Sequence, residues 1–266
     1  MAATRSIHSL VVGGTRGLGR AVVRALAAEG HAVSVIGRRP PMEADEPRSG
    51  VRHWAVDLTD GQRLSDALAE IRAVNPPLRN LVCAQRYRGQ GDAWEGELAT
   101  SLTATKRLIE WLAEGAEETA DKSVVIAGSI ASHFVAGEQP LGYHVAKAGL
   151  EQMVRYYAVA LGPKGIRVNS VSLPAFLKEE SRAFYREHQE LQDLYASIIP
   201  LGRMGTAEEI AKVIAFLCSP GAAFITGQRL VVDGGLSLQW QESLARQLTA
   251  LNTVEVVRRS TGAGTP

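Results

Sequence analysis

The sequence predicts an α/β protein of one domain: a doubly wound parallel sheet of about seven strands with helices on both faces. Short β-branched runs alternate with longer stretches of helical period along most of the chain, which is typical of repeated βα units. Several of the short runs are almost continuously apolar, as expected of strands that are buried on both faces. The first run also leads directly into a glycine-rich turn, a connection typical of nucleotide-binding sheets.

The elements follow this alternation in order. β-branched and apolar runs predict strands at 6–12, 32–36, 51–56, 80–84, 123–127, 166–172 and 229–232. Stretches of helical period between them predict helices at 18–29, 61–74, 96–116, 143–161 and 207–219. Thr206 followed by Glu209 is a capping box that marks the start of the last helix.

Two segments interrupt the alternation. Residues 38–50 (RRPPMEADEPRSG) contain three prolines, so a loop or a single turn is expected where a βαβ unit would carry a helix. Residues 175–200 form a charged and aromatic insertion, which we interpret as a lid over a site; the alternative is a solvated surface helix. The chain ends in STGAGTP, a small and polar tail that is expected to fray.

The composition is that of an ordinary globular protein. The 266 residues are 45% hydrophobic and 21% charged, which excludes a disordered, collagen-like or coiled-coil chain. Lys and Arg number 29 against 28 Asp and Glu, a formal charge of +1. Because this balance lacks the excess of basic residues that nucleic acid or an anionic membrane attracts, we expect a small-molecule partner, no nucleic acid and no membrane.

Cysteines and apolar stretches narrow the setting. Cys83 and Cys218 lie in separate apolar runs, so we expect buried thiols, and no metal site is predicted. The N-terminal apolar run leads into glycines instead of a cleavage site for a signal peptide. The longest stretch of low polarity, residues 124–137, is shorter than a membrane span. These observations predict a cytoplasmic protein.

The glycine-rich turn predicts a nucleotide site. Gly13, Gly17 and Gly19 stand between the first strand and the first helix. Glycine allows a tight turn and lets a pyrophosphate approach the amides at the helix N-terminus, where the helix dipole favours an anion. Placed at the start of an alternating α/β chain, this spacing predicts a Rossmann-type dinucleotide site.

The residues after the second strand favour NADP over NAD. A carboxylate at this place would bind the ribose hydroxyls of NAD, but the sequence has Arg38 and Arg39, with no acid before Glu43. Arginine can bind a 2′-phosphate, and Arg16 in the glycine turn adds a further positive charge. If the two arginines only form a solvated turn, the choice of cofactor stays open.

Tyr143 and Lys147 lie four residues apart, which on a helix places both side chains on one face. With the glycine turn, with Ser129 just after a strand and with the closing run 198–235, the chain resembles the short-chain dehydrogenase/reductase family over residues 7–236. The most specific stretches are VGGTRGLG at 12–19, Asp57 in VDLTD, YHVAKAGL at 143–150, GIRVNSVSLP at 165–174 and the segment 200–235.

The resemblance implies a role for each matching residue. Tyr143 would be the general acid that protonates a carbonyl oxygen as hydride arrives from NADPH, and the base in the reverse direction. Lys147 would hold the nicotinamide ribose and favour the phenolate form of the tyrosine, and Ser129 would donate a hydrogen bond to the carbonyl oxygen. The alternative, if the resemblance does not extend to function, is that Tyr143 and Lys147 form a half-buried helix face and that Ser129 is an ordinary serine at the end of a strand. The cofactor-binding residues implied are Gly13, Thr15, Arg16, Gly17, Leu18, Gly19, Arg38, Arg39, Asp57, Leu58, Cys83, Ala84, Gln85, Tyr143, Lys147 and Pro174.

The chain departs from the family pattern near the reaction centre. Cys83-Ala84-Gln85-Arg86 stands where the family has Asn-Asn-Ala-Gly, and Ser101 stands for the asparagine that helps to relay protons. Pro174-Ala175 replaces a proline-glycine pair, and the threonine that usually follows is missing, so the nicotinamide end is expected to be held differently.

The segment after the fourth strand is a candidate for substrate binding. Residues 86–90 open beside the predicted cofactor, and their charges could bind a carboxylate, a phosphate or a polyhydroxy group. The alternative is a solvated loop or a subunit contact. The substrate-binding candidates are Arg86, Arg88 and Phe176. His133 and His144 lie near the predicted centre and are interpreted as polar packing.

The sequence thus predicts an NADPH-dependent carbonyl reductase, or an alcohol dehydrogenase in reverse, with Ser129, Tyr143, Lys147 and Ser101 as its catalytic residues. Residues 1–236 would form the NADP-binding and catalytic domain, with the lid at 175–200, and residues 237–266 a C-terminal extension. The alternatives are a family member that acts on a sugar or another specialised metabolite, and a non-catalytic NADP-binding sensor or scaffold. The resemblance also implies a homodimer or homotetramer, with residues 96–116 and 143–161 as interface candidates.

Overall fold

A parallel sheet of seven strands forms the centre of the molecule, in the order β3-β2-β1-β4-β5-β6-β7. The computed structural model describes residues 7–40, 50–74, 77–115 and 121–249. The order runs one way from β1 to β3 and the other way from β4 to β7, so the switch point lies between β1 and β4. The strands are β1 (His8–Val12), β2 (Ala32–Gly37), β3 (Val51–Ala55), β4 (Leu78–Cys83), β5 (Lys122–Ala127), β6 (Ile166–Ser172) and β7 (Arg229–Val231).

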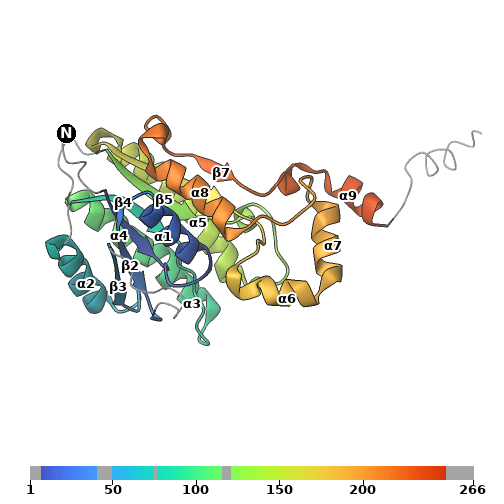
Figure 1. The fold of residues 1–266 in the computed structure, drawn as a ribbon, viewed down its shortest axis with the longest axis horizontal. Helices are drawn as coiled ribbons and strands as arrows, with labels where there is room; N and C mark the ends of the chain where they lie inside the picture. The colour runs from blue at the N-terminus through green and yellow to red at the C-terminus, as the bar shows by residue number, and fades with distance from the viewer. Residues whose placement is uncertain (1–6, 41–49, 75–76, 116–120, 250–266) are drawn as a thin grey trace, which may run out of the picture.

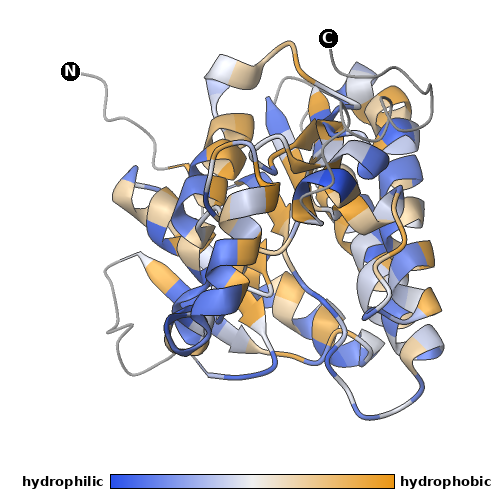
Figure 2. Cartoon of the chain, turned by 90° about the vertical axis from the view of Figure 1, so that its right-hand side faces the viewer, coloured by the Kyte–Doolittle hydropathy of each residue, from blue (hydrophilic) through white to orange (hydrophobic). Residues whose placement is uncertain are grey.

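Helices cover both faces of the sheet (Figure 1). α1 (Gly17–Ala28) and α8 (Ala207–Cys218) pack together on one face. α2 (Gly61–Val74), α4 (Ala104–Glu114) and α5 (Leu141–Leu161) bury their apolar sides on the other. Figure 2 shows apolar strands at the centre of the molecule and hydrophilic residues on the outward sides of the helices. The predicted doubly wound fold is therefore confirmed.

The sequence of β1 explains how one strand serves both faces. All five of its residues are buried. Because successive side chains of a strand point to opposite faces, Leu10 and Val12 join the core beneath α2, α4 and α5, while Val11 joins the core beneath α1 and α8. This two-sided burial accounts for the nearly continuous apolar runs that predicted the strands.

The helix predicted at 96–116 is the main departure from the expected elements. The structure divides it into α3 (Ala93–Glu97), a π-helix η1 (Leu98–Thr103) and α4. The apolar spacing continues across this segment, so periodicity alone did not reveal the wider turn. The remaining predicted helices and strands match the structure with ends shifted by no more than two residues, and the predicted capping box of Thr206 and Glu209 is present.

The insertion at 175–200 folds into short helices beyond the end of the sheet (Figure 1). These are η4 (Glu179–Ser181), α6 (Arg182–Glu187) and α7 (Gln189–Ile198). Its first residues are fixed to the body of the protein, because Leu177 forms a bridge with Thr206 and its amide donates to the Gly205 carbonyl at 2.8 Å.

The C-terminal extension contains α9 (Gln241–Leu248), which the sequence reading did not predict. The extension contacts the end of α7 at two places: Gln239, just before α9, donates through Nε2 to the Ile198 carbonyl at 2.6 Å, and Gln247 on α9 donates through Nε2 to the Ser197 carbonyl at 3.0 Å. Short turns of 3-10 helix complete the chain at η2 (Ile130–Ser132), η3 (Gly162–Lys164), η5 (Pro220–Ala222) and η6 (Leu236–Leu238).

Two of the predictions made from the sequence concern residues that the structure does not describe. Most of the proline-rich loop at 38–50 and the whole STGAGTP tail lie outside the described residues. Among the helices that are described, none combines the length and the apolar character that crossing a membrane requires.

Candidate active site

A pocket of about 940 Å³ opens at the carboxyl ends of the strands, where the switch point of the sheet lies. Almost all residues predicted for the site line it, from the glycine turn to Tyr143 and the first part of the insertion. Cys83 and Ser101 are the predicted residues that do not. The predicted residues that line the pocket are Gly13, Thr15, Arg16, Gly17, Leu18, Gly19, Arg38, Arg39, Asp57, Leu58, Ala84, Gln85, Arg86, Arg88, Ser129, Tyr143, Lys147, Pro174 and Phe176.

The glycine turn packs too tightly for side chains. Gly13 has a φ of +79°, and a Cβ added there would lie 2.8 Å from Gln85 Cα. A Cβ added to Gly19 would lie 2.2 Å from the Gly13 carbonyl oxygen. These contacts explain why the turn needs glycine at both positions.

The start of α1 already holds an anionic group in this structure. The Gly17 amide donates to Glu180 Oε1 at 2.9 Å. Burial raises the pKa of the Glu180 carboxyl, but the hydrogen bond from the Gly17 amide and the charges of Arg20 and Arg16 outweigh burial and lower it overall. A carboxylate from the insertion therefore shows that this amide accepts an anion, as the pyrophosphate of a dinucleotide would require.

A neighbouring ion pair fastens the insertion to α1. Glu179 Oε2 accepts from Arg20 Nη1 at 2.6 Å and from Arg24 Nη1 at 3.1 Å. The Arg20 side chain is only 4% exposed, so this contact ties a largely buried cation of α1 to the insertion. Residues 178–180 therefore lie across the glycine turn.

Positive charge gathers at the end of the pocket next to β2. Arg38 and Arg39 are exposed and line the pocket there. Arg16 Nη1 donates to the Thr15 carbonyl at 2.7 Å and to the Pro40 carbonyl at 3.1 Å, which holds its guanidinium beside the same turn. Asp57 lies nearby, with a carboxyl pKa lowered by hydrogen bonds from the Thr59 amide and hydroxyl.

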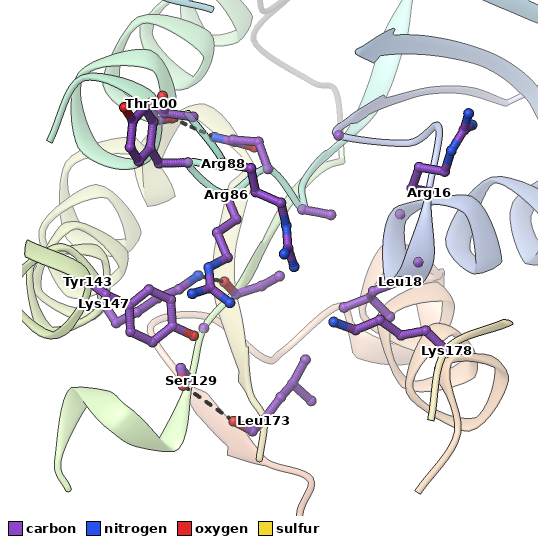
Figure 3. Close-up of a pocket in the computed structure, with 18 of the residues that line it drawn as sticks. Arg16, Leu18, Arg86, Arg88, Thr100, Ser129, Tyr143, Lys147, Leu173 and Lys178 are labelled. Atoms are coloured by element: carbon purple, nitrogen blue, oxygen red, sulfur yellow. Dashed lines mark hydrogen bonds between the residues drawn. The ribbon is translucent and has the colours of Figure 1, made fainter. Parts of the chain in front are cut away.

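Ser129, Tyr143 and Lys147 come together at the other end of the pocket (Figure 3). Ser129 follows β5, and its hydroxyl donates to the Leu173 carbonyl at 3.4 Å. Tyr143 and Lys147 lie on the first turns of α5, with Lys147 Nζ 5.7 Å from the centre of the tyrosine ring. The spacing of Tyr143 and Lys147 thus places both on the side of α5 that faces the pocket.

Lys147 is held by backbone and by charge. Its Nζ donates to the Ala127 carbonyl at 2.7 Å. Burial lowers the pKa of the Lys147 ammonium to about 8, with the Glu97 carboxylate opposing and Arg86 adding to this effect. Lys147 therefore loses its proton much closer to neutral pH than an exposed lysine does.

Arg86 stacks on Tyr143. Its Cζ lies 4.4 Å from the centre of the tyrosine ring, its Nη2 donates to Gln139, and its Nε lies 3.9 Å from Glu97 Oε1. Glu97 is buried and also accepts from the Ser101 hydroxyl at 2.8 Å. Ser101 is thereby turned toward Glu97 within the π-helix, while its neighbour Thr100 lines the pocket.

Cys83 is the last residue of β4 and does not line the pocket. Its side chain is buried, and burial raises the pKa of its thiol to about 12. The thiol is therefore protonated at neutral pH and suits packing better than nucleophilic chemistry. Gln85 next to it donates to Thr105 Oγ1 at 2.8 Å, which fixes a residue that replaces part of the family motif.

Several pocket residues were missed by sequence reasoning. Gln139, Lys178 and Glu180 line the pocket, and Glu97 lies beside it. The insertion carries many acidic and basic residues at close spacing, so its sequence did not distinguish Lys178 and Glu180 from neighbouring charged residues that face solvent. Only the prediction that the insertion covers a site pointed to the segment that contains them.

The chain is similar to known proteins over most of its length. Residues 12–237 match a family model described as "Enoyl-(Acyl carrier protein) reductase". The chain is 29% identical to "Dehydrogenase/reductase SDR family member 4" of Mus musculus, over 85% of this chain and 86% of that protein. It is 31% identical to "L-rhamnose 1-dehydrogenase (NAD(P)(+))" of Azotobacter vinelandii, over 87% of this chain and 97% of that protein. A solved short-chain type dehydrogenase/reductase from Mycobacterium ulcerans superposes with a TM-score of 0.76 at 28% identity, covering 88% of this chain and 91% of that one.

Proposed function

Because the chain belongs to the short-chain dehydrogenase/reductase family of oxidoreductases, we propose that it is an NADP(H)-dependent carbonyl reductase, or alcohol dehydrogenase in reverse. The observation that carries the proposal is that Ser129, Tyr143 and Lys147 share one pocket with the glycine turn. This places groups able to move a proton at one end of a cavity whose other end fits a dinucleotide.

The residues of the pocket fit the cofactor. The amide of Gly17 would hold the pyrophosphate in place of the Glu180 carboxylate that it binds in this structure. Asp57 would bind the adenine ring, and Lys147 the nicotinamide ribose. When bound, NADPH supplies the hydride that adds to the carbonyl carbon of the substrate.

The chain supplies the proton. Tyr143 would donate its phenolic proton to the carbonyl oxygen as the carbon receives the hydride, so that an alcohol leaves and a phenolate remains to be reprotonated. The Ser129 hydroxyl would donate a hydrogen bond to the same oxygen, where negative charge develops. The Lys147 ammonium would stabilise the phenolate between turnovers.

The preference for NADP(H) rests on Arg16, Arg38 and Arg39. Their side chains line the end of the pocket that the adenosine would occupy, and between β2 and Pro40 the described chain has no carboxylate to bind ribose hydroxyls. Titration with NADPH and with NADH, followed by nicotinamide fluorescence, tests this preference. Arg38→Ala should weaken NADPH binding about tenfold, as loss of a charge-assisted hydrogen bond would, and change NADH binding little.

A second candidate is a protein that binds NADP without turnover. Ser101, which stands for a family asparagine, hydrogen bonds to Glu97 and does not line the pocket. Tyr143→Phe separates the two candidates, because an enzyme would keep NADPH binding and lose ketone-dependent oxidation of NADPH. A wild-type protein that binds NADPH but oxidises it with none of a broad set of ketones and keto-sugars would favour the second candidate.

A further inference from the structure

Three cations surround the middle of the pocket. Arg86, Arg88 and Lys178 all line it, and Figure 3 shows Arg88 and Lys178 extending into the space between Tyr143 and Leu18. Lys178 lies on the side of the glycine turn, with its Cδ 3.3 Å from where a Cβ of Gly17 would be. Arg86 lies on the side of Tyr143. The three charges thus extend from the expected pyrophosphate site to the expected reaction centre.

Arg88 has no direct polar partner in the described part of the chain, and the Glu97 carboxylate only partly offsets the effects of burial and of the neighbouring cations on its pKa. Within residues 7–40, 50–74, 77–115 and 121–249, its side chain makes no hydrogen bond and no ion pair. Burial and the neighbouring charge of Arg86 lower the pKa of the Arg88 guanidinium, and burial with Arg88 and Arg86 lowers that of the Lys178 ammonium. Like charges held together in a partly buried pocket repel one another, so an anionic ligand bound between them would be stabilised.

Arg86 is held in place by other residues of the protein. Gln139 accepts from its Nη2, Glu97 lies 3.9 Å from its Nε, and the Tyr143 ring stacks against it. The Nε atom itself is buried without a hydrogen bond to the described residues. A guanidinium that is fixed against the tyrosine ring is placed to bind a group that lies close to the reacting carbonyl.

Resting on the proposed function, we infer that the substrate is a short oxo acid, a carbonyl compound with an oxyanion group a few bonds from the carbonyl, which Arg86 and Arg88 bind. The distance of 4.4 Å between Arg86 Cζ and the Tyr143 ring sets this spacing, because the same small molecule must reach both residues. A carboxylate and a phosphate would both satisfy two guanidinium groups. Lys178, beside Gly17, belongs to the cofactor side of the pocket.

The test compares substrates that carry an oxyanion with close analogues in which the oxyanion is esterified or absent. The probes are 2-oxobutanoate and 3-oxobutanoate with their methyl esters, and dihydroxyacetone phosphate with dihydroxyacetone. NADPH oxidation by the full-length protein gives kcat and KM for each. We expect kcat/KM to be about ten- to hundredfold higher for at least one charged probe than for its neutral partner, mainly through a lower KM. The acid and phosphate arms tell which oxyanion is preferred.

Arg88→Gln is the informative variant, because Arg88 has no partner in the described chain whose loss would disturb folding. It should reduce the ratio of kcat/KM between charged and neutral probes about tenfold or more, and leave the Kd for NADPH within about threefold. Arg63→Gln is the matched control, since Arg63 lies on α2 with a side chain 74% exposed and does not line the pocket.

Different failures lead to different conclusions. If neutral ketones are reduced in a Tyr143-dependent way as well as their charged partners, the oxo-acid inference is wrong and the proposed function stands. If Arg88→Gln weakens NADPH binding as much as it weakens the charged probe, Arg88 serves the cofactor and the inference is also overturned. If the protein neither binds nor oxidises NADPH or NADH with any probe, the proposed function itself fails.

Discussion

Glu180 competes for the amide that the proposed cofactor needs. Its carboxylate accepts from the Gly17 amide, so a pyrophosphate that binds there must displace it. We predict that Glu180→Gln tightens NADPH binding by about two- to fivefold, because a negative charge at a helix N-terminus contributes about 0.3–1 kcal/mol. Fluorescence titration measures this. Glu190→Gln on α7 is the control, and weaker NADPH binding by Glu180→Gln would contradict the competition.

The pKa of Lys147 leads to a second prediction, which concerns the pH dependence of carbonyl reduction. Its ammonium has a pKa lowered to about 8, so the proposed stabilisation of the phenolate is present below that pH and is lost as the pH rises above it. We expect kcat/KM for carbonyl reduction to fall above about pH 8. Because the Glu97 carboxylate raises the pKa of Lys147, Glu97→Gln should move this fall to lower pH.

A control two residues away tests the origin of the pH effect. Glu95 is exposed on α3, so Glu95→Gln should leave the pH profile where it is in the wild-type protein. An unchanged profile in Glu97→Gln would show that Lys147 is not the titrating group.

Among the individual residues of the candidate site, those that belong to local motifs were predicted from the sequence, and those that only the tertiary structure brings to the site were missed. The glycine turn and the pair Tyr143 and Lys147 depend on local spacing, which a sequence displays. Glu180 reaches Gly17 from 163 residues away, and no local pattern encodes that approach. Glu97 lies within a predicted helix, but its burial beside Arg86 depends on how α3 and η1 pack.

Among the elements, α5 serves two purposes. Its first turns carry Tyr143 and Lys147, and its opposite stripe leaves Val145, Tyr156 and Val159 exposed. These three positions fall within one side of a helix, since their separations of 11 and 14 residues are close to whole numbers of turns. With the homodimer or homotetramer implied by the resemblance, we propose this stripe as a contact between copies of the chain.

Val159→Asp tests that contact. Val159 is 81% exposed, so the substitution should leave folding intact, while a buried carboxylate would disfavour association. Light scattering should show the mass of a multimer for the wild-type protein and a lower mass for the variant. Leu238→Asp on η6, at a position 87% exposed, is the control. A wild-type protein with the mass of one chain would refute the proposed contact.

The elements themselves were largely predictable. Strands and helices that pack on a common core carry a periodic apolar pattern, so β1 to β7 and most long helices were found. The exposed helices α6, α7 and α9 were not located, because none of them buries an apolar stripe. The π-helix η1 was predicted as part of a longer α-helix, because the apolar spacing continues through it.

For the molecule as a whole, the pocket unites distant parts of the chain. Its lining runs from Gly13 to Tyr185 and includes the ends of several strands as well as the insertion. A ligand that binds the folded protein alone stabilises all of it, by about 2.7 kcal/mol at a concentration one hundred times its Kd. We therefore expect saturating NADPH to raise the Tm by roughly 4–8 °C, measured by calorimetry.

The same measurement separates binding from chemistry. NADPH should raise the Tm of Tyr143→Phe about as much as that of the wild-type protein. NADH at equal concentration should raise the Tm of either protein less. Equal shifts with both nucleotides would argue against a role of Arg16, Arg38 and Arg39 in selecting the cofactor.

The contact between α9 and α7 has a practical consequence. Gln239 and Gln247 bind the carbonyl groups of Ile198 and Ser197, at the C-terminal end of the insertion, while Glu179 fastens its beginning to α1. Both ends of the insertion are thus held by residues of other segments. If the insertion covers the site as a lid, we expect a proteolytic cut near residue 240 to alter the rate at which ligands enter and leave, even though this residue lies outside the pocket.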